Sequence, residues 1–327
     1  MSKVLRIGTR DSQLAVWQAT LVQDLLRARG VDSELVYMKS EGDIDTVTPL
    51  YALGVQGVFT KTLDAALLNK RIDIAVHSMK DVPTQLAQGI RQAAVLQRAS
   101  YKDIFVYKED ADLDTLGFTN GKWNSAQSAV LSQPFTIATS SIRRIAQWLH
   151  RFPGHRIDNL RGNVNTRLRK VAESNWNGAI FAAAGVERIG LRPEKSVDLD
   201  WMLPAPAQGA IMIVCREDDE YSFSSTQPLD HPDTALCTRI ERDFLRTLMG
   251  GCSTPISGLA QITGDSVHFR GNIISTDGSV MAAAERTVSR AGATGLGVEL
   301  GHHLLENGAA PIIESIRKKG VASDGNA

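Results

Sequence analysis

The 327-residue chain has few of the features that mark several large classes of protein. It has only three cysteines, Cys215, Cys237 and Cys252, and no C-x-x-C spacing, which argues against a disulfide framework or a zinc site and favours a reducing compartment. It has no apolar run long enough to span a membrane. Its first residues, MSKVLRIGTR, turn polar at once and lack the apolar stretch of a secretory signal. We therefore expect a cytoplasmic protein without a metal site or a membrane partner.

The sequence also lacks an excess of charge of either sign, because 36 Lys and Arg residues balance 36 Asp and Glu residues. A protein that binds polyanions is usually basic overall, so the composition does not indicate a nucleic-acid partner. The hydrophobic content of 43% and the aromatic content of 6% are typical of an α/β protein. The length is sufficient for two or three domains, each with its own core.

A pattern of strand, polar turn and helix occurs twice along the chain. Residues 4–8 (VLRIG) and 135–139 (FTIAT) predict strands, each followed by a polar turn and a helix. A further helix is predicted at 60–69, and further strands at 72–76 and 179–185. The apolar faces of the two turn-following helices are expected to consist of Leu14, Trp17, Leu21 and Leu25 in the first and of Ile142, Ile145, Ala146 and Leu149 in the second. The repeated order predicts two α/β domains of related topology, with parallel-rich sheets and ligand loops at strand ends.

The remainder of the chain predicts a third region of α+β type. A helix at 236–249, with Ile240, Phe244, Leu245 and Leu248 inward, ends at Gly250 and Gly251. Two strand patterns flank Asp277-Gly278, which indicates a hairpin, and a last helix is predicted at about 293–306. Residues 108–134 predict a surface excursion, residues 220–234 a linker, and residues 317–327 a frayed tail.

The segment from Thr139 to Lys170 holds eight basic residues and one acidic residue, Asp158. Such a run is often only a solvated face. Here the arginines follow a Thr-Ser-Ser turn that opens a helix, and helix amides, hydroxyls and guanidinium groups together form a carboxylate or phosphate site. A similar turn, Thr9 to Ser12, opens the first helix. Two facing anion sites would suit a ligand with many carboxylates.

Two further segments carry reactive side chains. Asp81 follows a buried strand and Lys80, at the place where α/β proteins position active residues. Such a pair is often only an ion pair, but a carboxylate there could also stabilise a cationic reaction intermediate and transfer protons. His77 is interpreted as structural. Cys252 follows two glycines that permit a sharp turn, so its thiol is expected to be accessible, whereas Cys215 and Cys237 lie in apolar or helical patterns and are expected to be buried.

These segments resemble the hydroxymethylbilane synthase (porphobilinogen deaminase) family. The matching blocks occur in the family's order and extend from residue 6 to about 260. They are Gly8-Thr9-Arg10 with Ser12, Leu14, Ala15 and Gln18; IDIAVHSMKDVPT at 72–84; ATSSIRRIAQ at 138–147; LRGNVNTRL at 160–168; AGVERIGL at 184–191; and ERDFL with GGCSTPI within 241–256.

The resemblance implies three domains. Two are periplasmic-binding-protein-like (type II) α/β domains, the first formed by residues 1–98 with 208–228 and the second by residues 101–204. The third is a small α+β domain, residues 231–316, that carries the cofactor, and residues 317–327 would be a flexible tail. The resemblance also implies a monomer.

The resemblance further implies a transferase of porphyrin and heme biosynthesis. It would condense four porphobilinogen molecules, with loss of ammonia, into the linear tetrapyrrole hydroxymethylbilane (preuroporphyrinogen). Asp81 would be the catalytic carboxylate. A dipyrromethane cofactor would be held by a thioether to Cys252 and by Ser12, Lys80, Asp81, Thr139, Ser140, Ser141, Arg143, Arg144 and Arg161. The substrate porphobilinogen would be bound by Arg10, Arg143, Arg161, Arg167, Arg188 and Gln208.

The sequence departs from the family's pattern at a few positions. Val55 and Gln56 stand in a loop where Gly and Lys are usual, so a carboxylate contact is missing and the loop is expected to be stiffer. Ala207 replaces a usual Gly, which affects the expected hinge, and Thr62 replaces a frequent Glu.

Two alternative functions remain open at this point. A noncatalytic solute-binding protein for a polycarboxylate would use the same fold, but the Cys252 loop argues against it. A nucleic-acid binder would use the basic segment 139–170, but the neutral overall charge and the scarcity of aromatic residues there argue against it.

Overall fold

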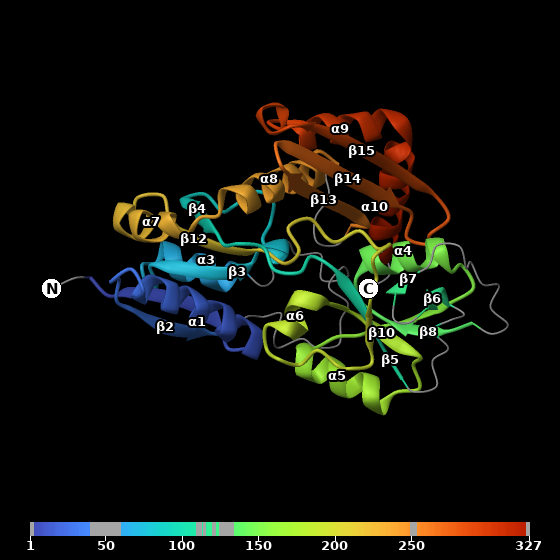
Figure 1. Ribbon diagram of the computed structural model, residues 1–327, viewed down its shortest axis with the longest axis horizontal. Coiled ribbons are helices and arrows are strands. Elements are labelled where there is room, and N and C mark those ends of the chain that lie inside the picture. Colours follow the sequence, from blue (N-terminus) through green and yellow to red (C-terminus); the bar gives the residue numbers. More distant parts are fainter. Residues whose placement is uncertain are drawn as a thin grey trace.

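The computed structural model describes residues 3–39, 60–108, 113, 116–119, 122–123, 134–248 and 254–324, with side chains up to Lys318. Within these ranges the chain forms two five-stranded sheets, a three-stranded sheet and a short two-stranded ribbon (Figure 1). The ribbon consists of β6 (Phe118–Thr119) and β7 (Lys122–Trp123). No helix in this part of the chain is long and apolar enough to cross a bilayer.

The first sheet has the strand order β2-β1-β3-β12-β4. Its strands are β1 (Leu5–Arg10), β2 (Ser33–Met38), β3 (Ile74–Ser78), β4 (Ile90–Val95) and β12 (Ile211–Arg216), and its helices include α1 (Gln13–Arg27) and α3 (Lys61–Leu68). β1 is parallel to β2 and β3, whereas β12 is antiparallel to β3 and β4. All six residues of β12 are buried, as expected for a strand inside the sheet.

The second sheet repeats this plan, with the order β11-β5-β10-β8-β9. Its strands are β5 (Asp103–Tyr107), β8 (Thr136–Ala138), β9 (Arg156–Asp158), β10 (Gly178–Ala182) and β11 (Ser196–Asp198), and its helices are α4 (Ile142–Arg151), α5 (Val164–Glu173) and α6 (Ala183–Glu187). β8 is parallel to β9 and β10, and β5 is antiparallel to β10 and β11. The predicted repeat of topology is therefore confirmed, although each sheet is mixed.

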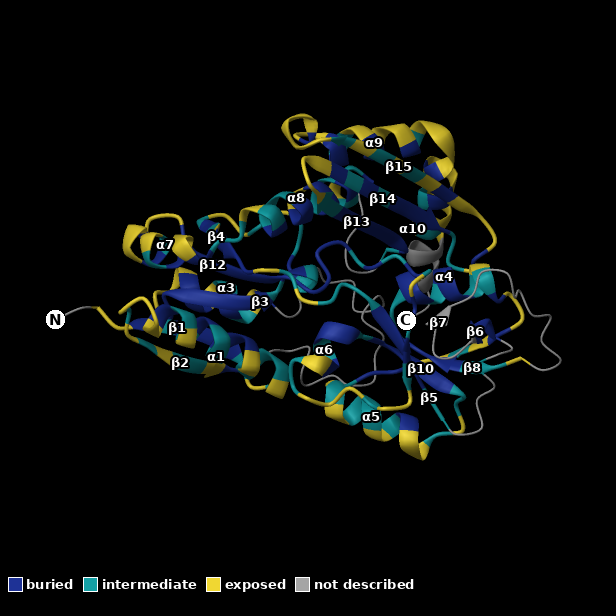
Figure 2. Ribbon diagram, in the orientation of Figure 1, coloured by how far each residue is buried: buried dark blue, intermediate teal, exposed yellow. Residues whose placement is uncertain are grey.

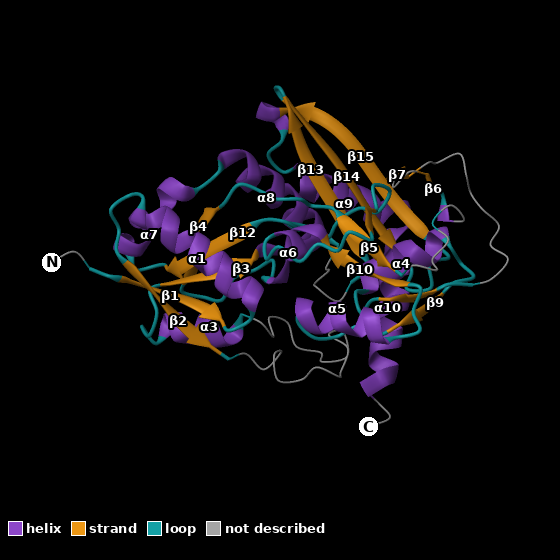
Figure 3. Ribbon diagram, turned by 60° about the horizontal axis from the view of Figure 1, so that its bottom comes forward, coloured by secondary structure: helices purple, strands orange, loops and turns teal. Residues whose placement is uncertain are grey.

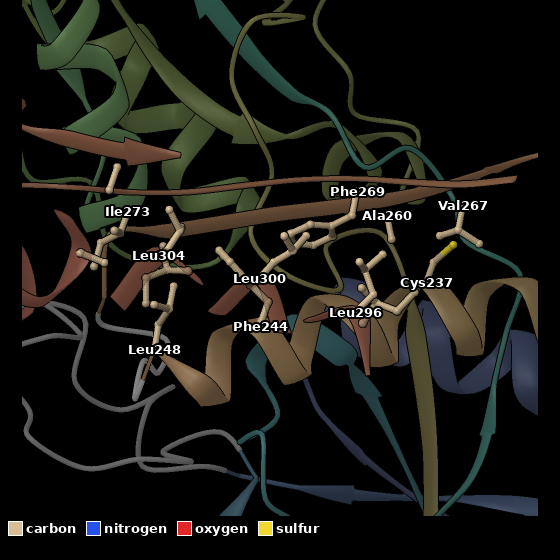
Figure 4. Packing of buried hydrophobic residues seen from close by; sticks show 14 of the residues in the cluster. Cys237, Phe244, Leu248, Ala260, Val267, Phe269, Ile273, Leu296, Leu300 and Leu304 are labelled. Carbon is tan, nitrogen blue, oxygen red and sulfur yellow. The ribbon is translucent and has the colours of Figure 1, made fainter. Parts of the chain in front are cut away.

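The third unit packs helices against an antiparallel sheet. Strands β13 (Ile256–Thr263), β14 (Ser266–Ile274) and β15 (Met281–Ser289) lie side by side (Figure 3), with α8 (Pro232–Thr247), α9 (Leu296–Leu304) and α10 (Ala310–Asp324). Phe244 and Phe269 form the centre of its core, with ring centroids 5.0 Å apart (Figure 4). Gly297 permits the close contact of α8 and α9, because a Cβ there would lie 2.0 Å from the Ile240 carbonyl oxygen. The predicted fold class, two α/β domains and a small α+β domain, is confirmed.

The chain passes twice between the two α/β units, and both crossings are tied to α8. Arg98 donates from Nη1 and Nη2 to Glu241, at 2.6 and 3.1 Å, and from Nε to the Gln208 carbonyl at 2.7 Å. The fully buried Glu241 carboxylate also accepts from the amides of Ala207 at 2.6 Å and Ala260 at 2.8 Å. Ala207 has a φ of 63°, the left-handed conformation that explains why Gly is usual there.

The structure corrects several local predictions. The inward face of α1 consists of Gln18, Ala19, Val22 and Leu26, whereas Trp17 is 36% exposed. The predicted linker 220–234 instead contains α7 (Glu220–Thr226) and the first turn of α8, because Asp219 caps α7 by accepting from the Ser222 amide. The predicted tail is helical as far as Asp324. Most of the excursion 108–134 lies outside the described residues. Figure 2 shows that most strands of the sheets are buried, whereas several helices expose their outer faces.

Candidate active site

A cleft of about 760 Å³ is lined by both α/β units. The segments that line it follow the carboxyl ends of β1, β3, β8 and β10, where parallel strands place ligand-binding loops. The seven basic residues of its described lining are Arg10, Lys39, Lys80, Arg143, Arg144, Arg161 and Arg167, and the two acidic ones are Asp11 and Asp81. The cleft is therefore suited to an anion with several charges.

Besides the short α6, three helices begin at this cleft and turn their positive ends toward it. Their N-cap residues, Ser12 of α1, Ser141 of α4 and Asn163 of α5, all line it. Neither Ser12 nor Ser141 makes a side-chain cap hydrogen bond, so the amides of these first turns are left for a ligand. The Asn163 side chain caps α5 by accepting from the Thr166 amide at 2.9 Å. The sequence analysis identified the first two of these helix ends and missed the third.

Asp81 lies at the end of a short 3-10 turn, Met79–Asp81, that follows β3. Met79 is 1% exposed, and its amide donates to the Ala210 carbonyl at 3.0 Å, so the turn is fixed on its inner side. Ser78, the last residue of β3, is hydrogen-bonded to the buried Gln18 of α1, with 2.9 Å between Nε2 and Oγ. The Asp81 carboxylate remains partly exposed at the cleft wall. This placement leaves Asp81 accessible to a ligand in the cleft.

The basic residues around Asp81 are poorly solvated. Burial lowers the pKa of Lys80 to about 8. The charge of Asp81 opposes this effect, and the charges of Arg144 and Arg143 reinforce it. Burial likewise lowers the pKa of Arg167 to about 10, with contributions from Arg144 and Arg161. The charged forms of both groups are therefore less stable in the empty cleft than in water. A bound carboxylate would stabilise these charges, so the cleft favours the binding of carboxylates.

Arg143 and Arg144 are held from behind by a buried carboxylate. Arg143 donates from Nη2 to Asp103 Oδ2 at 2.6 Å, and Arg144 donates from Nη2 to Oδ1 at 2.8 Å. Asp103 is completely buried, and these two guanidinium groups keep its pKa at about 2 despite burial. Arg144 also donates to the Ile180 carbonyl, and Arg143 to that of Leu203. The sequence analysis missed Asp103, because it lies far from the basic segment along the chain.

Thr139, Ser140 and Arg161 all line the cleft, on the side of the second unit. The Ser140 hydroxyl is 2.6 Å from Asn159 Oδ1 and from the Leu160 carbonyl, and it accepts from the Leu160 amide at 3.0 Å. It therefore joins the turn before α4 to the segment that carries Arg161. Arg161 is 3% exposed, and its carbonyl accepts from Lys170.

Gln208 lines the cleft and connects the two units, whereas Arg188 lies outside the described lining. The Gln208 amide group donates to Asp103 Oδ1 at 3.0 Å and accepts from Lys80 Nζ at 3.2 Å. Arg188 donates to the Gly209 carbonyl at 2.7 Å and lies 5.8 Å from the centre of the Trp17 ring. The prediction that Arg188 binds substrate stays a prediction, and in the structure its guanidinium donates to the backbone at the crossing between the units.

Three other predictions concern His77, the cysteines, and the loop with Val55 and Gln56. His77 is buried in β3, and its pKa is lowered to about 4 by burial and by Arg10, so it stays neutral at pH 7. Cys215 and Cys237 are buried, as predicted, and burial raises the pKa of the Cys237 thiol to about 11. Cys252 and the loop with Val55 and Gln56 lie outside the described residues.

Comparisons with known proteins address the fold and the family separately. Among solved structures, the chain is similar to the methionine-binding protein MetQ, with 14% identity, a TM-score of 0.42 and coverage of 69% of this chain and 89% of that chain. It is also similar to the Bordetella pertussis BvgS periplasmic VFT2 domain, with 14% identity, a TM-score of 0.40 and coverage of 69% and 86%. These likenesses are distant, and nothing about function is drawn from them.

Family models match most of the chain. The model described as "Porphobilinogen deaminase, dipyromethane cofactor binding domain" matches residues 5–223, which include all of the described cleft lining. The model described as "Porphobilinogen deaminase, C-terminal domain" matches residues 235–306, which hold most of α8, the three-stranded sheet and α9. The chain therefore belongs to the porphobilinogen deaminase family.

Proposed function

We propose that the chain is a transferase that condenses four porphobilinogen molecules, with release of ammonia, into hydroxymethylbilane. Membership of the porphobilinogen deaminase family supports the enzyme class. The observation that carries the proposal is the position of Asp81, a carboxylate that shares one cleft with seven basic side chains. A noncatalytic polycarboxylate-binding protein would need the basic residues but would have no use for this carboxylate.

The described residues of the cleft fit a dipyrromethane cofactor. Each pyrrole ring carries an acetate and a propionate, and guanidinium groups and helix N-termini are the groups that bind carboxylates best. We propose that the ring substituents are held by Ser12, Lys80, Thr139, Ser140, Ser141, Arg143, Arg144 and Arg161, and that the cofactor is attached covalently to Cys252. When bound, the cofactor supplies a free pyrrole α-carbon as the nucleophile on which the chain grows.

Asp81 is the proposed catalytic residue. Loss of ammonia from porphobilinogen leaves a cationic pyrrole, and a carboxylate at the cleft wall stabilises positive charge there. The same carboxylate can accept a hydrogen bond from a pyrrole NH and take part in proton transfer. The substrate would meanwhile be bound by Arg10, Arg143, Arg161, Arg167, Arg188 and Gln208.

Turnover of porphobilinogen by the wild type and by Asp81→Asn tests this proposal. The variant keeps the size of the side chain but removes its charge, so we expect the rate of ammonia release to fall by roughly 10²- to 10⁴-fold. Asp11→Asn is the matched control, because Asp11 is the other carboxylate of the cleft lining, and its loss should leave the rate close to that of the wild type. A near-normal rate in Asp81→Asn would remove Asp81 from the proposed role.

We also propose that the protein acts as a monomer in the cytoplasm and has no nucleic-acid partner. The buried, unpaired thiols of Cys215 and Cys237 are consistent with a reducing compartment. Seven basic side chains converge on one cleft, which favours a small anionic ligand over a nucleic acid.

A further inference from the structure

The turn that carries Asp81 is bound by an arginine from another unit of the fold. Arg242, on α8, donates from Nη1 to the Val82 carbonyl at 2.9 Å and to the Met79 carbonyl at 3.4 Å. Its Nη2 donates to the Pro83 carbonyl at 2.5 Å. One guanidinium group thus contacts carbonyl groups on both sides of Asp81 in the sequence. Within the turn itself the structure describes one weaker bond, from the Val82 amide to the Met79 carbonyl at 3.2 Å.

The segment of α8 that carries Arg242 is firmly packed in the fold. Ile240 and Phe244, on either side of Arg242, are 2% and 0% exposed and belong to the core of the third unit. The neighbouring Glu241 is fully buried and binds Arg98 and two backbone amides. In Figure 1, α8 lies between the first sheet and the strands of the third unit. A displacement of Arg242 would therefore require a displacement of the helix itself.

We propose that Arg242 is a positioning residue for Asp81, holding the segment 79–83 so that the carboxylate faces the cleft. This inference rests on the proposed function of Asp81 and adds a residue that does not line the cleft. The planar guanidinium suits the task because its donors can reach several carbonyls at once, whereas a lysine ammonium on a flexible stem acts as a single point charge. Hydrogen bonds from a charged donor are also stronger than those between neutral groups.

Through Arg242, the position of the third unit affects the position of Asp81. The same helix leads in the sequence to Gly250, Gly251 and Cys252, to which the cofactor is proposed to be attached. The position of α8 therefore affects both the placement of Asp81 and the origin of the proposed cofactor tether. A misplacement of a reacting group by about 1 Å can cost on the order of 100-fold in rate.

The test compares Arg242→Met and Arg242→Lys with a matched control on the same helix. Arg246→Met is that control, because Arg246 is 58% exposed and its guanidinium pairs with Asp243 at 2.9 Å. We expect Arg242→Met to lower kcat by roughly 10- to 100-fold with little change in KM. Arg242→Lys should retain more activity, and Arg246→Met should match the wild type. Intact mass should show the same cofactor content in all of these proteins.

A double-mutant cycle distinguishes positioning from a general structural role. If Arg242 acts through Asp81, Arg242→Met should lower the rate much less in the Asp81→Asn background than in the wild type. An equal loss in both backgrounds would overturn the proposal. Should Arg242→Met fail to fold, Arg242→Lys takes its place in the cycle.

Hydrogen–deuterium exchange provides a readout that does not depend on turnover. Peptides that cover residues 79–84 should exchange faster in Arg242→Met than in the wild type or Arg246→Met. Unchanged exchange in this segment would refute the contact on which the inference rests. Absence of porphobilinogen turnover in the wild type would instead reject the proposed function, and the exchange measurement would still decide whether Arg242 holds the segment.

Discussion

Replacement of Asp103 by asparagine removes the buried negative charge behind the cleft while keeping the shape of the side chain. Asp103 is completely buried, and the side chains of its partners Arg143 and Arg144 are only 5% and 7% exposed. Removing one partner of a buried ion pair costs about 3–5 kcal/mol, because the other charges remain buried without compensation. We therefore expect Asp103→Asn to lower the free energy of unfolding by about 4 kcal/mol at pH 7, with a fall in Tm on the order of 10 °C.

The pH dependence gives an independent estimate of the same effect. The pKa of Asp103 is lowered from its ordinary value of 3.8 to about 2 in the folded protein. The folded state thus favours the ionised form, and this accounts for about 2 kcal/mol of stability above about pH 4, which is lost as the pH falls through 2. The remainder of the expected loss comes from the guanidinium groups that stay buried in the variant. The difference between wild type and variant should therefore narrow in acid.

Urea unfolding of the two proteins between neutral and acidic pH is the appropriate assay. Asp198→Asn provides the control, because Asp198 pairs with Lys102 and Arg192 but its side chain is 29% exposed. We expect that variant to lose about 1 kcal/mol or less. A loss below about 1 kcal/mol for Asp103→Asn at pH 7 would refute the reasoning that this carboxylate holds the two arginines.

Three further predictions concern the cleft, the hinge and the contact between units. Because burial lowers the pKa of Lys80 to about 8, this residue loses its charge at higher pH, so the cofactor-free Cys252→Ser protein should bind free dipyrromethane more weakly above about pH 8 in a calorimetric titration, whereas the same protein with Lys80→Arg should keep its affinity. Ala207→Gly should relieve the backbone strain of the φ of 63°, which is worth about 1–2 kcal/mol. The loss of the buried methyl group and the greater freedom of the unfolded chain should offset this gain, so the free energy of unfolding from calorimetry should change by no more than about 1 kcal/mol. A Cβ at Gly278 would lie 2.4 Å from the His150 amide nitrogen, so Gly278→Ala should separate the β14–β15 turn from α4 and lower stability by about 2–4 kcal/mol in urea unfolding. A dipyrromethane affinity that does not change with pH while Lys80 is present, a large shift in Ala207→Gly or a fully stable Gly278→Ala would each contradict its prediction.

Local signals in the sequence were sufficient to predict the main elements of the fold. The strands that precede polar turns, the glycines that end helices and the Asp277-Gly278 hairpin all reflect interactions between residues close in sequence. The hairpin is confirmed, with β14 and β15 paired from Ser266–Ser289 to Ile274–Met281. The repeated order of elements likewise predicted the repeated topology of the two mixed sheets.

The predictions that failed depended on partners far away along the chain. Periodicity alone predicts that Arg143 and Arg144 lie on the outer face of α4. Both are instead buried on its inward face, because Asp103 from β5 neutralises their charges. Asp103 itself is a single acidic residue at the start of an apolar strand, and nothing in its own neighbourhood marks it as a counter-ion.

The most direct test of the account is the intact mass of the purified wild type and of Cys252→Ser. The central proposal is that a pyrrole chain attached to this cysteine extends into the basic cleft and meets Asp81. The wild type should be heavier than its sequence by two pyrrole units, and it should gain further units on addition of porphobilinogen. The Cys252→Ser protein should show neither increase. Equal masses in the two proteins, apart from the substitution, would contradict the account.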